Sequence, residues 1–173
     1  MEWPDKQSRE QFEITRFVEA YARLPGSPQL TILLKSERPD FAVRETATGR
    51  EFGVELTSVY FDDRSVPDVH KVDDHPADEP VPIPFDKNEL ERYQQRLLSA
   101  IQDKIRKARG GYDTTRPLIL AIYVNEYIGI YLGRPELEVF VRRYESIFDA
   151  MAPFAEVVFW NLRNGGVFRV RPS

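Results

Sequence analysis

Residues 38–60, RPDFAVRETATGREFGVELTSVY, decide the fold, because they read as two strands joined by a short turn. On both sides of Thr46-Ala47-Thr48-Gly49, apolar residues alternate with polar or small ones, which is the period of two of a strand with one apolar face. The connection ends in a glycine, which adopts the positive φ of a tight turn at little cost. We therefore predict a β-hairpin with one buried face.

Two carboxylates, Asp40 and Glu55, fall on one face of this hairpin in either of two registers. A two-residue loop at 47–48 pairs Asp40 directly with Glu55, at about 5 Å between their Cβ atoms. A loop at 48–49 pairs Asp40 with Thr57 and leaves Glu55 as a diagonal neighbour. Carboxylates this close raise each other's pKa unless a cation neutralises them. The pattern therefore predicts an oxygen-ligand site for Mg²⁺ or Mn²⁺.

Composition bounds the class of protein. The chain has 173 residues, the size of one ordinary domain, and we expect residues 1–173 to form a single domain. It has no apolar run of membrane-spanning length, no secretion signal at its N-terminus and no cysteine, so we expect a cytoplasmic protein that does not insert into membranes. Its net charge of −4 means that nucleic acid would have to bind through a local basic patch.

Helical and strand patterns alternate along the rest of the chain. A long acidic, proline-rich loop is predicted at about 61–87, as in a lid, a partner-binding segment or a disordered region. Helices are expected at 7–23, 88–109 and 136–148, a strand or buried segment at 30–35, and further strands at 118–127, 157–160 and 167–170. This order predicts an α/β fold with a mixed central β-sheet flanked by helices.

A lysine interrupts the apolar stripe of the helix expected at 88–109. The stripe consists of Leu90, Tyr93, Leu97, Ile101, Ile105 and Ala108. Lys104 falls near its centre, although lysine is almost never fully buried without a partner. Either its stem covers apolar surface with the ammonium in water, or the ammonium points at a buried anion. The functional interpretation places that ammonium beside Asp40 and Glu55.

Two groups of side chains near the C-terminus each have two possible roles. Four aromatic residues belong either to the core or to a contact between two copies of the chain: Phe154, Phe159, Trp160 and Phe168. Three arginines form either a basic patch or an ordinary solvated surface: Arg163, Arg169 and Arg171.

Together these residues carry a family resemblance. Pro39-Asp40, a hairpin-length gap, Glu55-x-Thr57 and a following helix with an inward lysine resemble the PD-(D/E)XK nuclease superfamily. The resemblance covers about 7–124 and implies a restriction-endonuclease-like core of α-β-β-β-α-β order. Asp40 matches the motif aspartate and Glu55 the motif acid. Thr57 stands where the superfamily's lysine usually stands, and Lys104 is the candidate to replace it.

The resemblance also implies a role for each site residue. Asp40 and Glu55 would be metal ligands, with the backbone carbonyl of Leu56 as a further contribution. A glutamate of the first helix would join them, and Glu13 is the choice, with Glu10 and Glu19 as alternatives. The candidate lysine would stabilise negative charge in the transition state or orient the attacking water.

The implied function is metal-dependent hydrolysis of phosphodiester bonds in nucleic acid, with Mg²⁺ or Mn²⁺ as cofactor and DNA favoured over RNA. The alternative is a catalytically degenerate nuclease fold that serves as an interaction domain for a protein partner. Thr57 in the lysine position and the acidic loop at 61–87 support this alternative.

Overall fold

A computed structural model describes residues 6–59, 87–124, 132–162 and 165–173. Apart from Lys87, the predicted acidic loop at 61–87 lies outside these residues. The described elements are α1 (Lys6–Tyr21), β1 (Leu30–Lys35), β2 (Phe41–Glu45), β3 (Glu51–Val59), α3 (Lys87–Arg109), β4 (Leu118–Val124), α5 (Arg134–Arg143), α6 (Glu145–Asp149), β5 (Phe154–Leu162) and β6 (Gly166–Val170). None of the described helices combines the length and apolar character that a membrane span needs.

The six strands form one mixed, open sheet in the order β1-β2-β3-β4-β5-β6. Strand β4 runs parallel to both of its neighbours, β3 and β5, whereas the β1-β2, β2-β3 and β5-β6 pairs are antiparallel. This confirms the predicted α/β fold with a mixed central sheet flanked by helices. The first described elements follow one another as helix, three strands, helix and strand.

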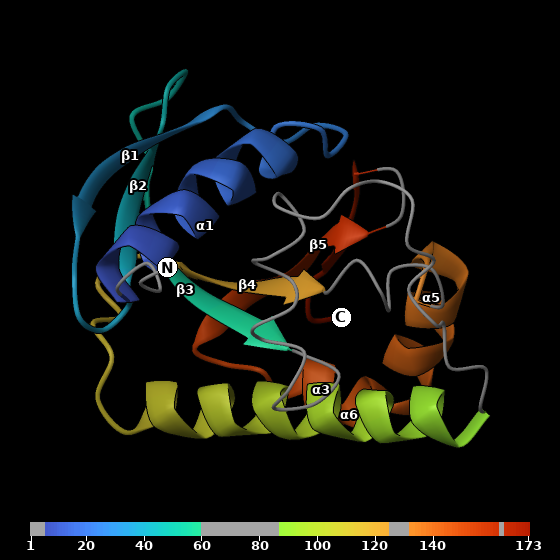
Figure 1. Ribbon diagram of the computed structural model, residues 1–173. Coiled ribbons are helices and arrows are strands. Elements are labelled where there is room, and N and C mark those ends of the chain that lie inside the picture. Colours follow the sequence, from blue (N-terminus) through green and yellow to red (C-terminus); the bar gives the residue numbers. More distant parts are fainter. Residues whose placement is uncertain (1–5, 60–86, 125–131, 163–164) are drawn as a thin grey trace.

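Helices cover both faces of the sheet (Figure 1). Helix α1 packs its Ile14, Phe17 and Tyr21 against one face, in a cluster with Phe41 and Val54. Helix α3 lies on the opposite face, where its apolar stripe joins the buried residues of α5 and α6. Strand β4 contributes buried residues to both clusters, as its near-continuous apolar sequence predicts.

The hairpin has the first of the two predicted registers. Phe41 lies opposite Val54, and extending this pairing by one residue puts Asp40 across from Glu55. The predicted two-residue loop is wrong, however. The Glu45 amide donates to the Arg50 carbonyl at 2.8 Å, which leaves a four-residue connection at 46–49. The last of these residues, a glycine, has φ +74°, so its positive φ closes the turn as expected.

The C-terminal elements differ from the predicted boundaries. The single helix expected at 136–148 is divided into α5 and α6 at Tyr144, whose backbone (φ −115°, ψ 30°) leaves the helical region. The Tyr144 ring packs against Phe140 with 5.1 Å between centroids, and its hydroxyl accepts a hydrogen bond from Gln95 of α3. Tertiary packing thus overrides the helical periodicity at this position. Strand β5 also begins three residues earlier than predicted, at Phe154.

Candidate active site

Asp40 and Glu55 are held next to each other by the hairpin. Glu55 lies in the middle of β3 and is only 3% exposed, whereas Asp40 lies just before β2 and is half-buried. The Asp40 carboxylate accepts a hydrogen bond from the backbone amide of Leu56, with 2.8 Å between N and Oδ2. The residue after Glu55 therefore fixes the Asp40 carboxylate against β3.

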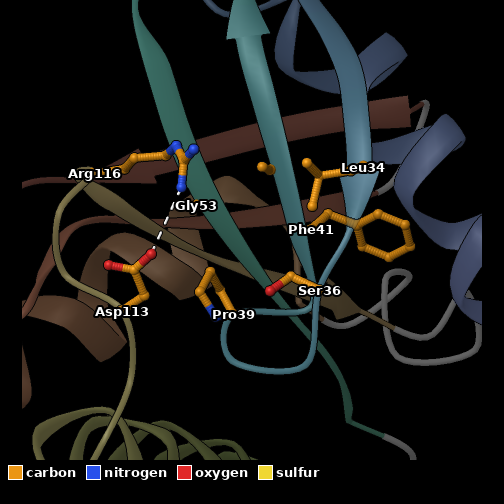
Figure 2. Close-up of a pocket in the computed structure, with 8 residues that line it drawn as sticks. Leu34, Ser36, Pro39, Phe41, Gly53, Asp113 and Arg116 are labelled. Atoms are coloured by element: carbon orange, nitrogen blue, oxygen red, sulfur yellow. Dashed lines mark ion pairs between the residues drawn. The ribbon is translucent and has the colours of Figure 1, made fainter.

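Close packing of Pro39 on Gly53 brings the Asp40 loop to β3. A β-carbon on Gly53 would come within 2.6 Å of Pro39 Cγ and 2.7 Å of Leu118 Cδ2. Such distances are shorter than van der Waals contact, so only glycine lets Pro39 lie this close to the strand. Figure 2 shows Pro39 and Gly53 beside a cavity of about 50 Å³, near the Asp113–Arg116 ion pair. This cavity is much smaller than the roughly 300–1,000 Å³ of small-molecule pockets, so it is too small to enclose a small-molecule ligand.

Lys104 directs its ammonium at this pair of carboxylates. Its Nζ lies 2.5 Å from Glu55 Oε1, and its side chain is 23% exposed. The sequence left two roles open to this lysine, and in the structure its ammonium contacts a buried anion. Thr57, on the same strand as Glu55, is buried and carries no charge.

Tyr112 is a member of this cluster that sequence reasoning missed. Its hydroxyl donates to Glu55 Oε1, the same oxygen that binds Lys104, at 2.6 Å. Within the part of the chain that the structure describes, the other oxygen, Glu55 Oε2, is buried without a hydrogen-bond partner. The one available signal was the Gly110-Gly111 helix stop, which turns the chain at the end of α3, but it does not specify where the next side chain points.

The electrostatics of the cluster favour a bound cation. Burial, and after it the charge of Glu55, raises the pKa of Asp40 to about 6, although the Leu56 amide and Lys104 oppose this shift. Burial and the hydrogen bond to Glu55 also raise the pKa of Tyr112, so its hydroxyl remains a donor. The described cluster thus contains two carboxyl groups and one ammonium. A further positive charge would neutralise the second carboxylate.

The three α1 glutamates bind residues other than Asp40 and Glu55 in the described part of the chain. Glu13, the residue chosen from the sequence, accepts a hydrogen bond from Ser58 Oγ at 2.9 Å. Ser58 follows Glu55 by three residues, so alternation along the strand puts their side chains on opposite faces of the sheet. Glu10 binds Lys35 at 2.7 Å and contributes to the raised pKa of Asp40. Among the described interactions, Glu10 therefore acts on Asp40 through its charge alone, which is the smallest contribution to the shift.

The remaining α1 alternative, Glu19, lies on the surface. It forms an ion pair with Arg16 at 3.6 Å, and both side chains are more than half exposed. It takes no part in the cluster.

The donor set of Asp40 and Glu55 suits a Mg²⁺-like ion. Mg²⁺ is usually held by one or two carboxylates, keeps several waters and completes its shell with substrate phosphate. Glu55 Oε2 offers a buried oxygen that has no other partner among the described residues. No three His, Cys, Asp or Glu side chains gather in the described ranges, so an all-protein ligand cage is not present there. The Leu56 carbonyl is a backbone oxygen next to Glu55 that could add one ligand.

Two of the three C-terminal arginines, expected to form either a basic patch or a solvated surface, lie against a buried carboxylate. Glu156 of β5 is 4% exposed, and Arg171 and Arg169 approach its Oε2 at 3.1 Å and 3.9 Å. The Tyr21 hydroxyl donates to its other oxygen at 2.5 Å. Arg163, the third of these arginines, lies outside the described residues. This cluster therefore joins α1 to β5 and the segment around β6.

The aromatic residues near the C-terminus belong to the core. Phe154, Phe159 and Trp160 are buried, and Phe168 packs against the cluster on the α3 face of the sheet. The structure therefore shows the first of their two predicted roles, which is packing in the core.

Searches of protein-family models, of curated proteins and of solved structures found no match to this chain.

Proposed function

We propose that this protein is a metal-dependent nuclease that hydrolyses phosphodiester bonds, built on a PD-(D/E)XK-like core. One observation carries the proposal: Asp40, Glu55 and Lys104 form a half-buried cluster in which Glu55 Oε2 has no partner among the described residues. The helix, three strands, helix and strand order of the described elements supports it, as does the hairpin register that puts the two carboxylates side by side.

Each residue has a defined task in this proposal. Asp40 and Glu55 hold Mg²⁺ or Mn²⁺, with the Leu56 carbonyl as a further ligand. When bound, such an ion neutralises phosphate charge and lowers the pKa of a coordinated water. Lys104 uses one of its three donors on Glu55, so others remain for a phosphate oxygen or a water. Thr57 could contribute at most a hydrogen bond.

The substrate contact proposed here uses local positive charge, because the chain as a whole carries a net charge of −4. Arg38 is exposed, lies two residues before Asp40, and contributes to the electrostatics at Tyr112. Arg38 and Lys104 are therefore the cations best placed to meet a phosphate backbone at the site. DNA remains the favoured nucleic acid.

Cleavage of labelled oligonucleotides with and without Mg²⁺ or Mn²⁺ tests the proposal. Glu55→Gln should abolish cleavage while preserving the fold, because it removes the ligand charge and keeps the side-chain shape. Glu51→Gln is the matched control, since Glu51 lies on the same strand but binds Arg44 and Arg116. The proposal is wrong if the wild type cleaves neither DNA nor RNA and titration calorimetry detects no metal binding that depends on Glu55.

The second candidate is a non-catalytic interaction domain of the same fold. Thr57 in the lysine position favours it, as does the lack of a third metal-ligating side chain in the described part of the chain. A pull-down that captures a partner in EDTA, and loses it when 62–86 is deleted, would support this function. A partner that binds the deleted form equally well would argue against a role for that segment.

A further inference from the structure

We propose that Tyr112 is a positioning residue that fixes the Glu55 carboxylate so that only Oε2 faces a bound divalent cation. This inference rests on the proposed function, because it concerns the same site. It adds a residue that the motif does not contain and specifies how Glu55 binds the ion, through one oxygen and not two.

The two Glu55 oxygens differ in their hydrogen bonds. Oε1 accepts a hydrogen bond from Tyr112 at 2.6 Å and another from Lys104 at 2.5 Å. Oε2 is buried and accepts none from the described residues. A buried carboxylate oxygen without a partner costs free energy, so such an arrangement needs a reason. A cation at Oε2 supplies one, since both donors on Oε1 would remain in place.

Two donors also restrict rotation of the carboxylate. With Lys104 alone, Glu55 could rotate about its terminal torsion and offer either oxygen, because that torsion is broad and roughly two-fold. The Tyr112 hydroxyl approaches from a different segment of the chain and opposes this rotation. Partners that orient metal-binding side chains in this way typically contribute 10- to 100-fold to metal affinity or activity.

Tyr112 is itself held by the backbone on both sides. Its amide donates to the Ala108 carbonyl at 3.2 Å, which ties it to the end of α3. The next amide, of Asp113, donates to the Arg38 carbonyl at 3.1 Å, which ties the segment to the loop that carries Asp40. Tyr112 therefore lies where α3, the Asp40 loop and Glu55 meet.

The alternative is that Tyr112 only packs against the core. Its ring does contact the apolar cluster between α3 and the sheet. Phenylalanine would keep that packing and lose only the hydroxyl, so Tyr112→Phe separates the two roles. Tyr144→Phe is the matched control, because Tyr144 is also half-buried and its hydroxyl binds Gln95 instead of the site.

The experiment measures Mn²⁺ binding to the full chain by titration calorimetry, without any substrate. Tyr112→Phe should weaken binding by about 10-fold, and Tyr144→Phe should leave it unchanged. Addition of Mg²⁺ to the wild type should also give a tyrosine ultraviolet difference spectrum, because a cation on Oε2 weakens the hydrogen bond at Oε1. This signal should be lost in Tyr112→Phe and retained in Tyr144→Phe.

The outcomes separate this inference from the proposed function. If the wild type binds Mn²⁺ and Tyr112→Phe binds it equally well with the same difference spectrum, Tyr112 only packs and the inference is overturned while the metal site stands. If the wild type binds no Mn²⁺, both are overturned. In the Glu55→Gln background, Tyr112→Phe should cause no further loss of Mn²⁺ affinity. Such a loss would also contradict the positioning role.

Discussion

Replacing Asp40 by asparagine should make the metal-free protein more stable above pH 6, although it removes a candidate ligand. Burial, followed by the charge of Glu55, raises the pKa of Asp40 from 3.8 to about 6. Asparagine keeps an oxygen that can accept the Leu56 amide hydrogen bond, but it carries no charge. The variant therefore isolates the free-energy cost of ionising Asp40 in the folded protein.

The sign and size of the effect follow from proton linkage. A raised carboxyl pKa stabilises the folded state fully below the unfolded value of 3.8, and this contribution is lost as the pH rises through about 6. At 1.36 kcal/mol per pH unit, the loss is about 3 kcal/mol at pH 8. The free energy of unfolding of Asp40→Asn should therefore exceed that of the wild type by up to about 3 kcal/mol at pH 8, and by only about 1 kcal/mol at pH 4.5.

Urea unfolding in EDTA at these two pH values measures the difference. Asp103→Asn is a control of opposite sign, because hydrogen bonds from Lys107 and Arg106 lower the pKa of this exposed aspartate. The reasoning would be refuted if the difference in the free energy of unfolding between Asp40→Asn and the wild type did not depend on pH. It would also be refuted if Asp40→Asn were less stable than the wild type at pH 8. Saturating Mn²⁺ should make the wild type more stable than Asp40→Asn at pH 8, because only the wild type retains both carboxylates.

Three further predictions concern the packing around the site and the carboxylate cluster at Glu156. Lys104→Met should lower the free energy of unfolding by about 3 kcal/mol at pH 8 in urea, since it strands the buried Glu55 carboxylate, and adding Glu55→Gln to it should restore much of that loss. Gly53→Ala should cost about 1–3 kcal/mol through overpacking and weaken Mn²⁺ binding, whereas Gly110→Ala, where an added methyl group meets only ordinary contacts, should do neither. Glu156→Gln should lower the thermal midpoint without changing Mn²⁺ affinity, because Glu156 lies two strands from β3 and binds Tyr21 of α1, whereas Glu55 binds Lys104 of α3 on the other face of the sheet. A parallel loss of Mn²⁺ affinity would contradict that separation.

Local periodicity was sufficient to predict the hairpin and the inward lysine. The alternation at 38–60 predicts both strands and that their two carboxylates lie on one face, because a half-buried strand imposes a period of two on its own sequence. The stripe of α3 likewise predicts that Lys104 points inward, since each position on a helix has a fixed angular place. These features depend on residues within one element or on two adjacent strands.

Long-range contacts were not predictable in this way. Tyr112 meets Glu55 across 57 residues, and no periodicity links the two positions. The direction in which each α1 glutamate points depends on how α1 is rotated against the sheet, and the sequence pattern does not fix this angle. The break at Tyr144 has the same origin, because its hydroxyl bonds to another helix.

The energetics of the cluster give the strongest physical reason to look for a cation. Asp40 and Glu55 destabilise each other, and one ammonium together with one phenol satisfies a single oxygen of Glu55. A ligand that binds only the folded state adds RT ln(1 + [L]/Kd) to its stability, about 2.7 kcal/mol at 100 times Kd. This gain is close to the cost of keeping Asp40 ionised above pH 6. A divalent cation would thus convert the least favourable electrostatic arrangement at this site into a stabilising one, and thermal unfolding with and without Mn²⁺ measures that change directly.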